Sequence, residues 1–329
     1  MFKKFTFLIT LGVSSAAAIA AIPATADETA LRTVTSLPTT LTVTQSFLQV
    51  FVPKANELGK GQYKIDYKGG PEVVPASKGA SAIQRGIVDV LWGPAGYYAG
   101  TVPEAYAMMG SHRPVEELWA NGGFDLLNRI WAKKLNARIL AWGESETQMH
   151  VFTVFKPKVS PIGPDLSGKK IRTSPTYLAL LKAMGATPVR MPGPEVYTGL
   201  QRGVIDGFAW PVSGVTQLGV GDLIKYRVDP GFYRNNSIVI INLDVWNKLS
   251  RDGKDALQKA SRHYEKASLK FMADDIERES KVLVEKGMKI LKLDGEVAKK
   301  YIETADNAMW QRLDTLVEGD TSGLKAKFR

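Results

Sequence analysis

The chain has 329 residues, no cysteine and a formal net charge of +10 at pH 7. Without cysteine, disulfide bonds, thiol catalysis and thiolate metal sites are excluded. The basic residues are spread among acidic ones, unlike the dense basic block of a nucleic-acid-binding arm. The charge therefore fits an anionic ligand or no specific partner, and we expect no nucleic acid as a partner.

The first residues have the pattern of a secretory signal. Two lysines precede an apolar stretch over residues 5–22, and the small residues 24–26 form an Ala-x-Ala-like cleavage site. We predict a signal peptide over residues 1–26 that is cleaved near Ala26, which places the mature protein in the periplasm. An uncleaved membrane anchor is the alternative, but the stretch is short and rich in Ala and Ser.

Two stretches of the mature chain resemble each other. Residues 82–92 and 199–210 share Gln-Arg-Gly, two β-branched residues and an aspartate, at a constant offset of 117. Each stretch is typical of a helix that ends at a glycine, a short turn and a buried strand. We therefore predict two related α/β lobes.

The predicted elements alternate between strands and helices, which indicates mostly parallel sheets with helices on both faces. In the first lobe we predict strands at 31–36, 63–67 and 137–142 and a helix at 47–58. In the second lobe we predict strands at 151–155, 170–173 and 187–189 and helices at 176–184 and 195–201. A strand at 237–242 is expected to return to the first lobe, and a long helix at 252–286 is expected to brace both lobes.

The predicted domains are therefore discontinuous. Lobe I takes residues 27–150, and residues 238–265 return to it. Lobe II takes residues 151–237, with a helix over 266–290 that crosses over. Helices over 291–329 are expected to pack on the lobes. A ligand cleft is expected between the two lobes.

The usual signatures of catalysis are missing. The three histidines lie far apart and outside any metal-binding spacing, and no nucleophile elbow, phosphate loop or dinucleotide fingerprint occurs. We therefore predict no metal, no cofactor and a binding protein rather than an enzyme.

Candidate binding residues follow from the rule that ligands lie beyond the carboxyl ends of parallel strands. The residues near such positions are Thr39, Glu72, Trp92, Tyr97, Tyr98, Gln148, Arg172 and Trp210. Aromatic side chains supply flat walls, and a buried arginine supplies two parallel donors that match a carboxylate. Arg172 could also be a solvated strand end, Glu72 a surface loop residue, and either tryptophan part of a core.

Three segments carry more specific motifs. Residues 165–172 read Asp-Leu-Ser-Gly-Lys-Lys-Ile-Arg, residues 184–189 read Met-Gly-Ala-Thr-Pro-Val, and residues 195–207 end in Gly-Leu-Gln-Arg-Gly-Val-Ile-Asp-Gly. With them the chain resembles the solute-binding proteins of tripartite ATP-independent periplasmic (TRAP) transporters, also grouped as extracytoplasmic solute-binding protein family 7. The resemblance implies two lobes that close over a ligand, a membrane permease driven by an ion gradient, and an ion pair between Arg172 and the ligand carboxylate.

Departures from the family narrow the expected ligand. Sialic-acid binders of the family have an arginine near the position of Gln148 and an asparagine near that of Trp210, so a sugar acid of that kind is disfavoured. Binders of 2-oxo acids that use a metal ion have Glu before this tryptophan. Ala209 stands there in this chain, which again predicts no bound metal.

What surrounds Arg172 in this resemblance is mostly aromatic. Phe208 joins the aromatic wall, and Asn235 or Asn236 offers a polar contact. We therefore predict a small monocarboxylate with an apolar or aromatic body, bound by a monomer that delivers it to TRAP permease subunits. Two alternatives stay open: an exported ligand-sensing subunit for a signalling kinase, and a periplasmic enzyme.

Overall fold

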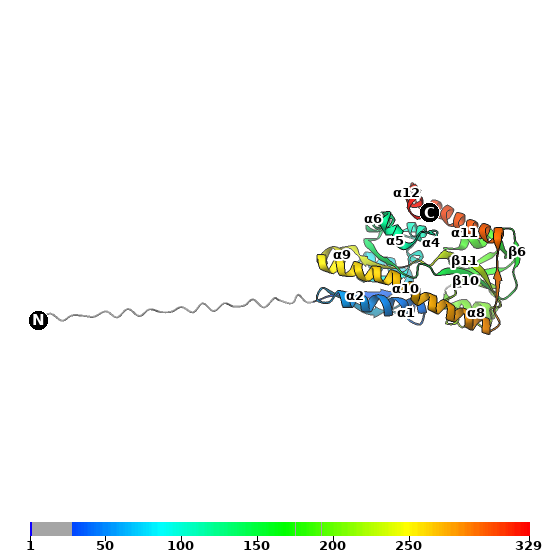
Figure 1. Cartoon of the computed structure of the whole chain (residues 1–329), viewed down its shortest axis with the longest axis horizontal. Coiled ribbons are helices and arrows are strands. Elements are labelled where there is room, and N and C mark those ends of the chain that lie inside the picture. Colours follow the sequence, from blue (N-terminus) through cyan, green and yellow to red (C-terminus); the bar gives the residue numbers. More distant parts are fainter. Residues whose placement is uncertain (2–27, 175, 192) are drawn as a thin grey trace.

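The computed structural model describes residues 28–174, 176–191 and 193–329, together with Met1. Two α/β lobes lie next to each other, and one long helix runs past both of them (Figure 1). This is the two-lobed fold that the sequence predicts. The predicted signal peptide lies, apart from Met1, outside the described residues.

The sheet of the first lobe has the strand order β2-β1-β3-β12-β4. Its strands are β1 (Thr29–Thr35), β2 (Tyr63–Gly69), β3 (Val90–Pro94), β4 (Ala137–Trp142) and β12 (Ser237–Asn242). Strand β12 runs antiparallel to both of its neighbours, β3 and β4, whereas β1 pairs in parallel with β2 and β3. The predicted return of residues 237–242 to this sheet is therefore confirmed.

The sheet of the second lobe has the strand order β13-β11-β5-β10-β8-β9. Its strands are β5 (Gln148–Thr153), β8 (Lys170–Thr173), β9 (Thr187–Arg190), β10 (Gly207–Pro211), β11 (Tyr226–Arg234) and β13 (Lys289–Lys292). Here β5 is the one strand that runs against the others. A short hairpin of β6 (Lys158–Ser160) and β7 (Gly163–Asp165) is separate from both sheets.

The helices occupy the connections between the strands. They are α1 (Thr42–Ser46), α2 (Val52–Leu58), α3 (Gly79–Gln84), α4 (Tyr106–Met109), α5 (Val115–Ala120), α6 (Gly123–Leu135), α7 (Leu178–Ala183), α8 (Val196–Gln201), α9 (Leu243–Lys248), α10 (Arg251–Glu285), α11 (Gly295–Leu316) and α12 (Ser322–Phe328). The helix predicted over 47–58 begins earlier, at Thr42, and its middle turn over Phe47–Phe51 is π-helical. No helix of the described residues is long and apolar enough to cross a membrane.

Both faces of each sheet are buried. Successive side chains of a strand point to opposite faces, and here they pack in different apolar clusters. In β3, Leu91 packs in one apolar cluster, whereas Trp92 packs in another that includes α10. In β10, Phe208 and Ala209 are divided between two clusters in the same way.

Helix α10 joins the two lobes. Its N-terminal half places Leu257 and Tyr264 in a core of the first lobe, and its C-terminal half places Leu283 in a core of the second. At about 1.5 Å per residue its 35 residues span about 50 Å. The predicted bracing helix is therefore confirmed.

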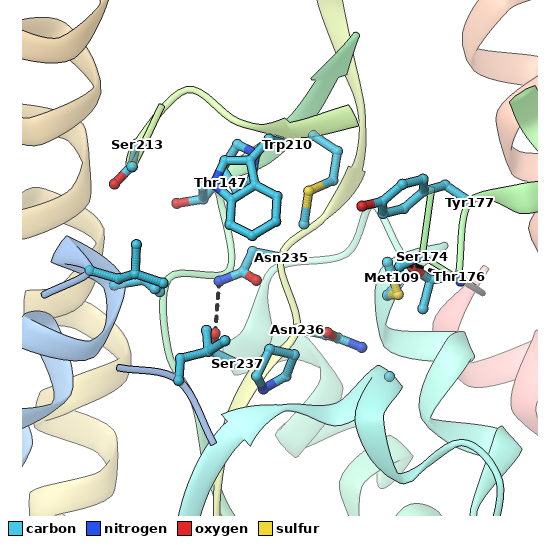
Figure 2. Close-up of a pocket in the computed structure, with 18 of the residues that line it drawn as sticks. Met109, Thr147, Ser174, Thr176, Tyr177, Trp210, Ser213, Asn235, Asn236 and Ser237 are labelled. Atoms are coloured by element: carbon cyan, nitrogen blue, oxygen red, sulfur yellow. Dashed lines mark hydrogen bonds between the residues drawn. The ribbon is translucent and has the colours of Figure 1, made fainter. Parts of the chain in front are cut away.

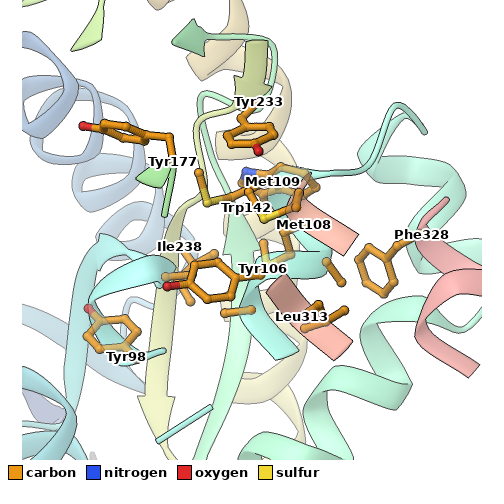
Figure 3. Close-up of a cluster of buried hydrophobic side chains, with 14 of the residues drawn as sticks. Tyr98, Tyr106, Met108, Met109, Trp142, Tyr177, Tyr233, Ile238, Leu313 and Phe328 are labelled. Carbon is orange, nitrogen blue, oxygen red and sulfur yellow. The ribbon is translucent and has the colours of Figure 1, made fainter. Parts of the chain in front are cut away.

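The C-terminal helices pack on the first lobe and reach the second. Figure 3 shows Leu313 of α11 and Phe328 of α12 in one cluster with Tyr106 and Met108. The Tyr233 hydroxyl, at the end of β11, donates a hydrogen bond to the carbonyl of Ala305 in α11 (2.8 Å).

The two related stretches of the sequence form the same structure twice. In the first lobe Asp89 bonds the backbone of Arg32 through both its side chain (2.8 Å) and its own N–H (2.8 Å). The Arg32 guanidinium in turn donates to the carbonyl of Gly86 (2.7 Å), whose φ is +67°.

The second lobe repeats each of these contacts. Asp206 bonds the backbone of Lys170 through its side chain (2.8 Å) and its N–H (2.7 Å). The Lys170 ammonium donates to the carbonyl of Gly203 (2.7 Å), whose φ is +65°. A glycine is favoured at both turns because a side chain is strained at positive φ. The prediction that each stretch is a helix, a glycine turn and a strand is thereby confirmed.

The chain passes from one sheet to the other between Trp142 and Gln148, and returns between Arg234 and Ser237. The predicted boundaries of the two lobes lie near these crossings and stay a prediction. The crossings matter for function because they meet at the same place, where the cavity described next is found.

Candidate functional site

A cavity of about 120 Å³ lies between the two lobes. The first lobe contributes Leu37, Leu41, Thr42, Val43, Pro94, Gly96, Tyr97 and Met109. The second lobe contributes Met149, Arg172, Ser174, Thr176, Tyr177, Trp210, Pro211, Ser213 and Gly214, and the remaining lining residues are Thr147, Asn235, Asn236, Ser237 and Met272. Several of these follow the carboxyl ends of parallel strands, where ligands bind in open α/β sheets.

Among the residues that the structure describes, Arg172 is the one charged residue that lines this cavity. It lies on β8 and is 6% exposed. Its Nε donates to the carbonyl of Met191 (2.9 Å), and its Nη1 donates to the hydroxyl of Tyr177 (2.8 Å) and, more weakly, to the carbonyl of Ala209 (3.5 Å). Its guanidinium carbon lies 5.2 Å from the centre of the Trp210 ring. The side chain is therefore held in place by neutral groups.

Two other buried arginines make the contrast clear. Arg227 is 7% exposed and pairs with Asp229 (2.8 Å), and Arg234 is 5% exposed and pairs with Glu146 (2.6 Å). No carboxylate of the described residues forms an ion pair with Arg172. A buried charge is costly unless it is paired, so the site favours an anion as its ligand.

The wall beside Arg172 is shaped by close contacts with the Trp210 indole. A Cβ on Gly193 would lie 2.9 Å from the ring, and a Cβ on Gly214, whose φ is +91°, would lie 3.3 Å from its Nε1. Figure 2 shows Trp210 with Thr147 beside it and Tyr177 pointing toward it. Tyr177 is fixed by a hydrogen bond from its hydroxyl to the carbonyl of Ala209 (3.0 Å).

Four of the predicted binding residues line the cavity, namely Tyr97, Arg172, Trp210 and Asn236. They come from the 3-10 helix over Ala95–Tyr98, from β8, from β10 and from the crossing before β12. Residues far apart in the sequence are therefore brought together as predicted, although their binding role stays a prediction.

Three predicted aromatic residues lie in the cores instead of the cavity. Trp92 is fully buried and donates from Nε1 to the hydroxyl of Tyr264 (2.9 Å). Tyr98 is 1% exposed. Phe208 stacks on Phe152, with 5.2 Å between the ring centres.

The different places of Trp92 and Trp210 have a simple cause. At the offset of 117, the match of Trp92 is Ala209, so Trp210 is one residue further along its strand. One residue along a strand reverses the face to which a side chain points. Trp210 therefore faces the cavity, whereas Trp92 faces the core.

The last three predicted residues lie outside the lining. Thr39, Glu72 and Gln148 are all exposed. The Glu72 carboxylate accepts a hydrogen bond from the N–H of Gly70 (2.5 Å), a local loop contact. The surface-loop alternative for Glu72 is the one that the structure supports.

Other lining residues were not predicted. Tyr177 lies five residues after Arg172 on the same sheet edge, so the strand-end rule could have found it. The methionines Met109, Met149 and Met272 lie on three unrelated elements, and no local pattern marks them.

The first crossing holds a buried acid, Glu144. It is 0% exposed and accepts hydrogen bonds from the hydroxyls of Ser46 (2.8 Å) and Tyr264 (2.5 Å). Burial raises the pKa of Glu144 to about 8, against the effect of these hydrogen bonds. No group of three or more His, Asp or Glu side chains within the described ranges could hold a metal ion.

Two α/β lobes, two crossings and a cavity between the lobes define the class of two-lobed solute-binding proteins. The chain belongs to the bacterial extracellular solute-binding protein family 7, whose model matches residues 34–314. These are the receptors of TRAP transporters, so the predicted family is confirmed.

Curated relatives are similar over part of their length. A monocarboxylate 2-oxoacid-binding periplasmic protein of Nostoc sp. is 25% identical over 215 residues, which are 62% of this chain and 58% of that protein. The match thus spans less than two thirds of the Nostoc protein. The 2,3-diketo-L-gulonate-binding periplasmic protein of Escherichia coli is 26% identical over 243 residues, 71% of this chain and 73% of that protein.

Solved structures share the fold over almost the whole chain. An extracytoplasmic solute receptor of Bordetella pertussis that binds pyroglutamic acid has a TM-score of 0.76 at 19% identity, covering 91% of this chain and 99% of its own. A TRAP periplasmic solute-binding protein of Ralstonia eutropha with bound (S)-2-acetolactate has a TM-score of 0.73 at 18% identity, covering 91% and 97%.

Proposed function

We propose that the protein binds a small organic acid with a single carboxylate in the periplasm and delivers it to a TRAP membrane permease. The observation that carries this proposal is Arg172, a nearly buried guanidinium in the cavity without a carboxylate partner among the described residues. A ligand carboxylate would supply the missing counter-charge and accept charge-assisted hydrogen bonds from it.

The rest of the cavity supports a ligand with few other polar groups. Most of the surface that lines the cavity is apolar, and three methionines and Trp210 contribute to it. A ligand with many hydroxyl groups would leave some of them unpaired against these side chains, which costs free energy. A body that is mainly apolar fits this lining better.

The names of relatives support the same class. The Nostoc relative is named for monocarboxylate 2-oxoacids, and the two solved structures hold pyroglutamic acid and 2-acetolactate. Each of these compounds is small and has one carboxylate. The E. coli relative is named for a more polar acid, so the lining, not the family alone, supports the choice.

Export and delivery complete the proposal. The predicted signal peptide over residues 1–26, cleaved near Ala26, would direct the mature protein to the periplasm. There we propose that it acts as a monomer and delivers its ligand to the permease. We propose no catalysis and no bound metal or cofactor. Steady turnover of any organic acid by the purified protein would contradict the receptor function.

A thermal-shift screen tests the proposal. The mature protein is unfolded, freed of ligand and refolded. It is then screened against organic acids with one or two carboxylates and against compounds without a carboxylate. A ligand at 100 times its dissociation constant stabilises the folded state by about 2.7 kcal/mol, which gives a clear rise in Tm. We expect such a rise with monocarboxylates, and silence across all the acids would contradict the proposal.

A further inference from the structure

Asn236 offers the cavity a polar group that the protein leaves unused. It lies in the second crossing, lines the cavity and is 3% exposed. Its side-chain Nδ2 is buried and has no hydrogen-bond partner among the described residues. Figure 2 shows this amide between Ser237 and the pair Ser174 and Thr176.

The neighbouring asparagine shows what a structural role would look like. Asn235 also lines the cavity and is 5% exposed, but its Nδ2 donates to the hydroxyl of Ser237 (2.9 Å). Its backbone carbonyl accepts a hydrogen bond from Trp142 Nε1 (2.7 Å). Asn235 is therefore used by the fold, whereas the Asn236 amide is not.

Two polar side chains that line the cavity beside Asn236 bond to each other and not to its amide. The hydroxyls of Ser174 and Thr176 form a hydrogen bond together. A Cβ on Gly96 would lie 3.9 Å from Asn236 Nδ2, so the third neighbour offers no polar side chain at all. A buried donor without a partner is costly, and most buried polar groups in native proteins are paired.

We propose that Asn236 is a specificity-determining residue whose Nδ2 donates a hydrogen bond to a second oxygen of the ligand. This rests on the proposed function and narrows it to monocarboxylates that carry a carbonyl or hydroxyl oxygen on an otherwise apolar body. The torsion that orients an asparagine amide is soft, so a small rotation turns Nδ2 to the ligand. Unsubstituted fatty acids leave this donor unpaired.

The position of Asn236 gives this contact a second effect. Arg172 belongs to the second lobe, and Asn236 belongs to the segment that leads into β12 of the first lobe. A ligand bound by both residues connects the lobes at two points. An acid that binds Arg172 alone connects them only by apolar contact.

The test uses acids with one carbon skeleton. Pentanoate, 2-oxopentanoate, 2-hydroxypentanoate and 4-oxopentanoate are titrated into the refolded mature protein by calorimetry. We expect at least one oxygenated acid to bind about 10- to 100-fold more tightly than pentanoate. In the Asn236→Leu variant this ratio should fall to near one, while pentanoate affinity stays within about threefold.

The matched control is Asn128→Leu, at a buried amide outside the cavity lining whose oxygen accepts a hydrogen bond from the N–H of Ile139 (2.7 Å). It should lower the Tm and leave the ratio unchanged. If Asn236→Leu does not fold, Asn236→Ala removes the amide without added bulk and gives the same comparison. A ratio near one in the unmodified protein, or a ratio that survives in both Asn236 variants, overturns the inference while pentanoate binding still upholds the proposed function. No binding of any acid, pentanoate included, overturns both.

Discussion

Arg172 is where a single substitution should change binding most. Arg172→Ala removes charge-assisted hydrogen bonds to the ligand carboxylate, each worth about 1.5–3 kcal/mol, so affinity should fall by at least about 100-fold. No carboxylate of the described protein loses a partner, and the Tm of the ligand-free protein should change little. Calorimetric titration and thermal unfolding check both expectations.

Arg172→Lys is the matched control for this change. Lysine keeps the positive charge but lacks the planar pair of donors, so it should restore only part of the affinity. An Ala variant that binds the acid as tightly as the unmodified protein would show that Arg172 is not the carboxylate contact.

Glu144 predicts how stability depends on pH. Its pKa is raised by burial from an ordinary 4.5 to about 8. Between these values the folded protein holds a proton that the unfolded chain has released, so its contribution to the free energy of unfolding is complete below pH 4.5 and is lost as the pH rises through about 8. Glu144→Gln cannot ionise, so its Tm should fall less between pH 5 and pH 8.

A second buried acid adds a decline of its own that both proteins share. Burial also raises the pKa of Glu265, to about 7, and it acts in the same direction. The decline of Tm in Glu144→Gln should therefore be shallower but not absent. Identical Tm profiles for the two proteins across this pH range would refute the assignment of a proton to Glu144.

The candidate site shows what single residues reveal before folding. Arg172, Trp210 and Tyr97 could be predicted as lining residues because the carboxyl ends of parallel strands are recognisable from the sequence, whereas Asn236 was predicted from the family resemblance. The face of a strand end is not recognisable, since a shift of one residue reverses it, as Trp92 demonstrates. Cavity-lining methionines were missed because only the packing of distant elements brings them together.

Among the secondary-structure elements, the 3-10 helix over Ala95–Tyr98 makes a close contact with the other lobe. It lies against Thr176, two residues before α7 begins. A Cβ on Gly96 would lie 2.7 Å from Cγ2 of Thr176, closer than real Cβ contacts allow. Glycine is thus required for the lobes to approach here. Gly96→Ala should hold them apart and weaken ligand binding, since only the fraction of molecules able to close binds tightly.

A glycine of the same loop provides the control. A Cβ on Gly100 would meet nothing within 4 Å, so Gly100→Ala should bind like the unmodified protein. We expect Gly96→Ala to lose about tenfold in affinity and to keep a larger radius of gyration in small-angle scattering when ligand is added. Equal affinity for the two variants would mean that the contact has no part in closure.

Across the whole molecule, most strands of the two sheets can be predicted from the sequence. Strands β4, β8 and β12 have the predicted bounds. Strands β11 and β13 were missed because their pattern is weak. β11 contains Pro and Gly within Tyr-Arg-Val-Asp-Pro-Gly-Phe-Tyr-Arg, and β13 has four residues with lysine at both ends. Their pairing is decided by the neighbouring strands of the sheet rather than by local preference.

The repeated glycine turn leaves one apolar residue of each lobe open to solvent. Ile87 follows Gly86 and is 54% exposed, and Val204 follows Gly203 and is 44% exposed. Because the chain has no cysteine of its own, cysteines introduced at these two positions would be the two attachment points for a pair of fluorescent dyes. Energy transfer between the two dyes would then report the separation of the lobes in single molecules, before and after an acid is added.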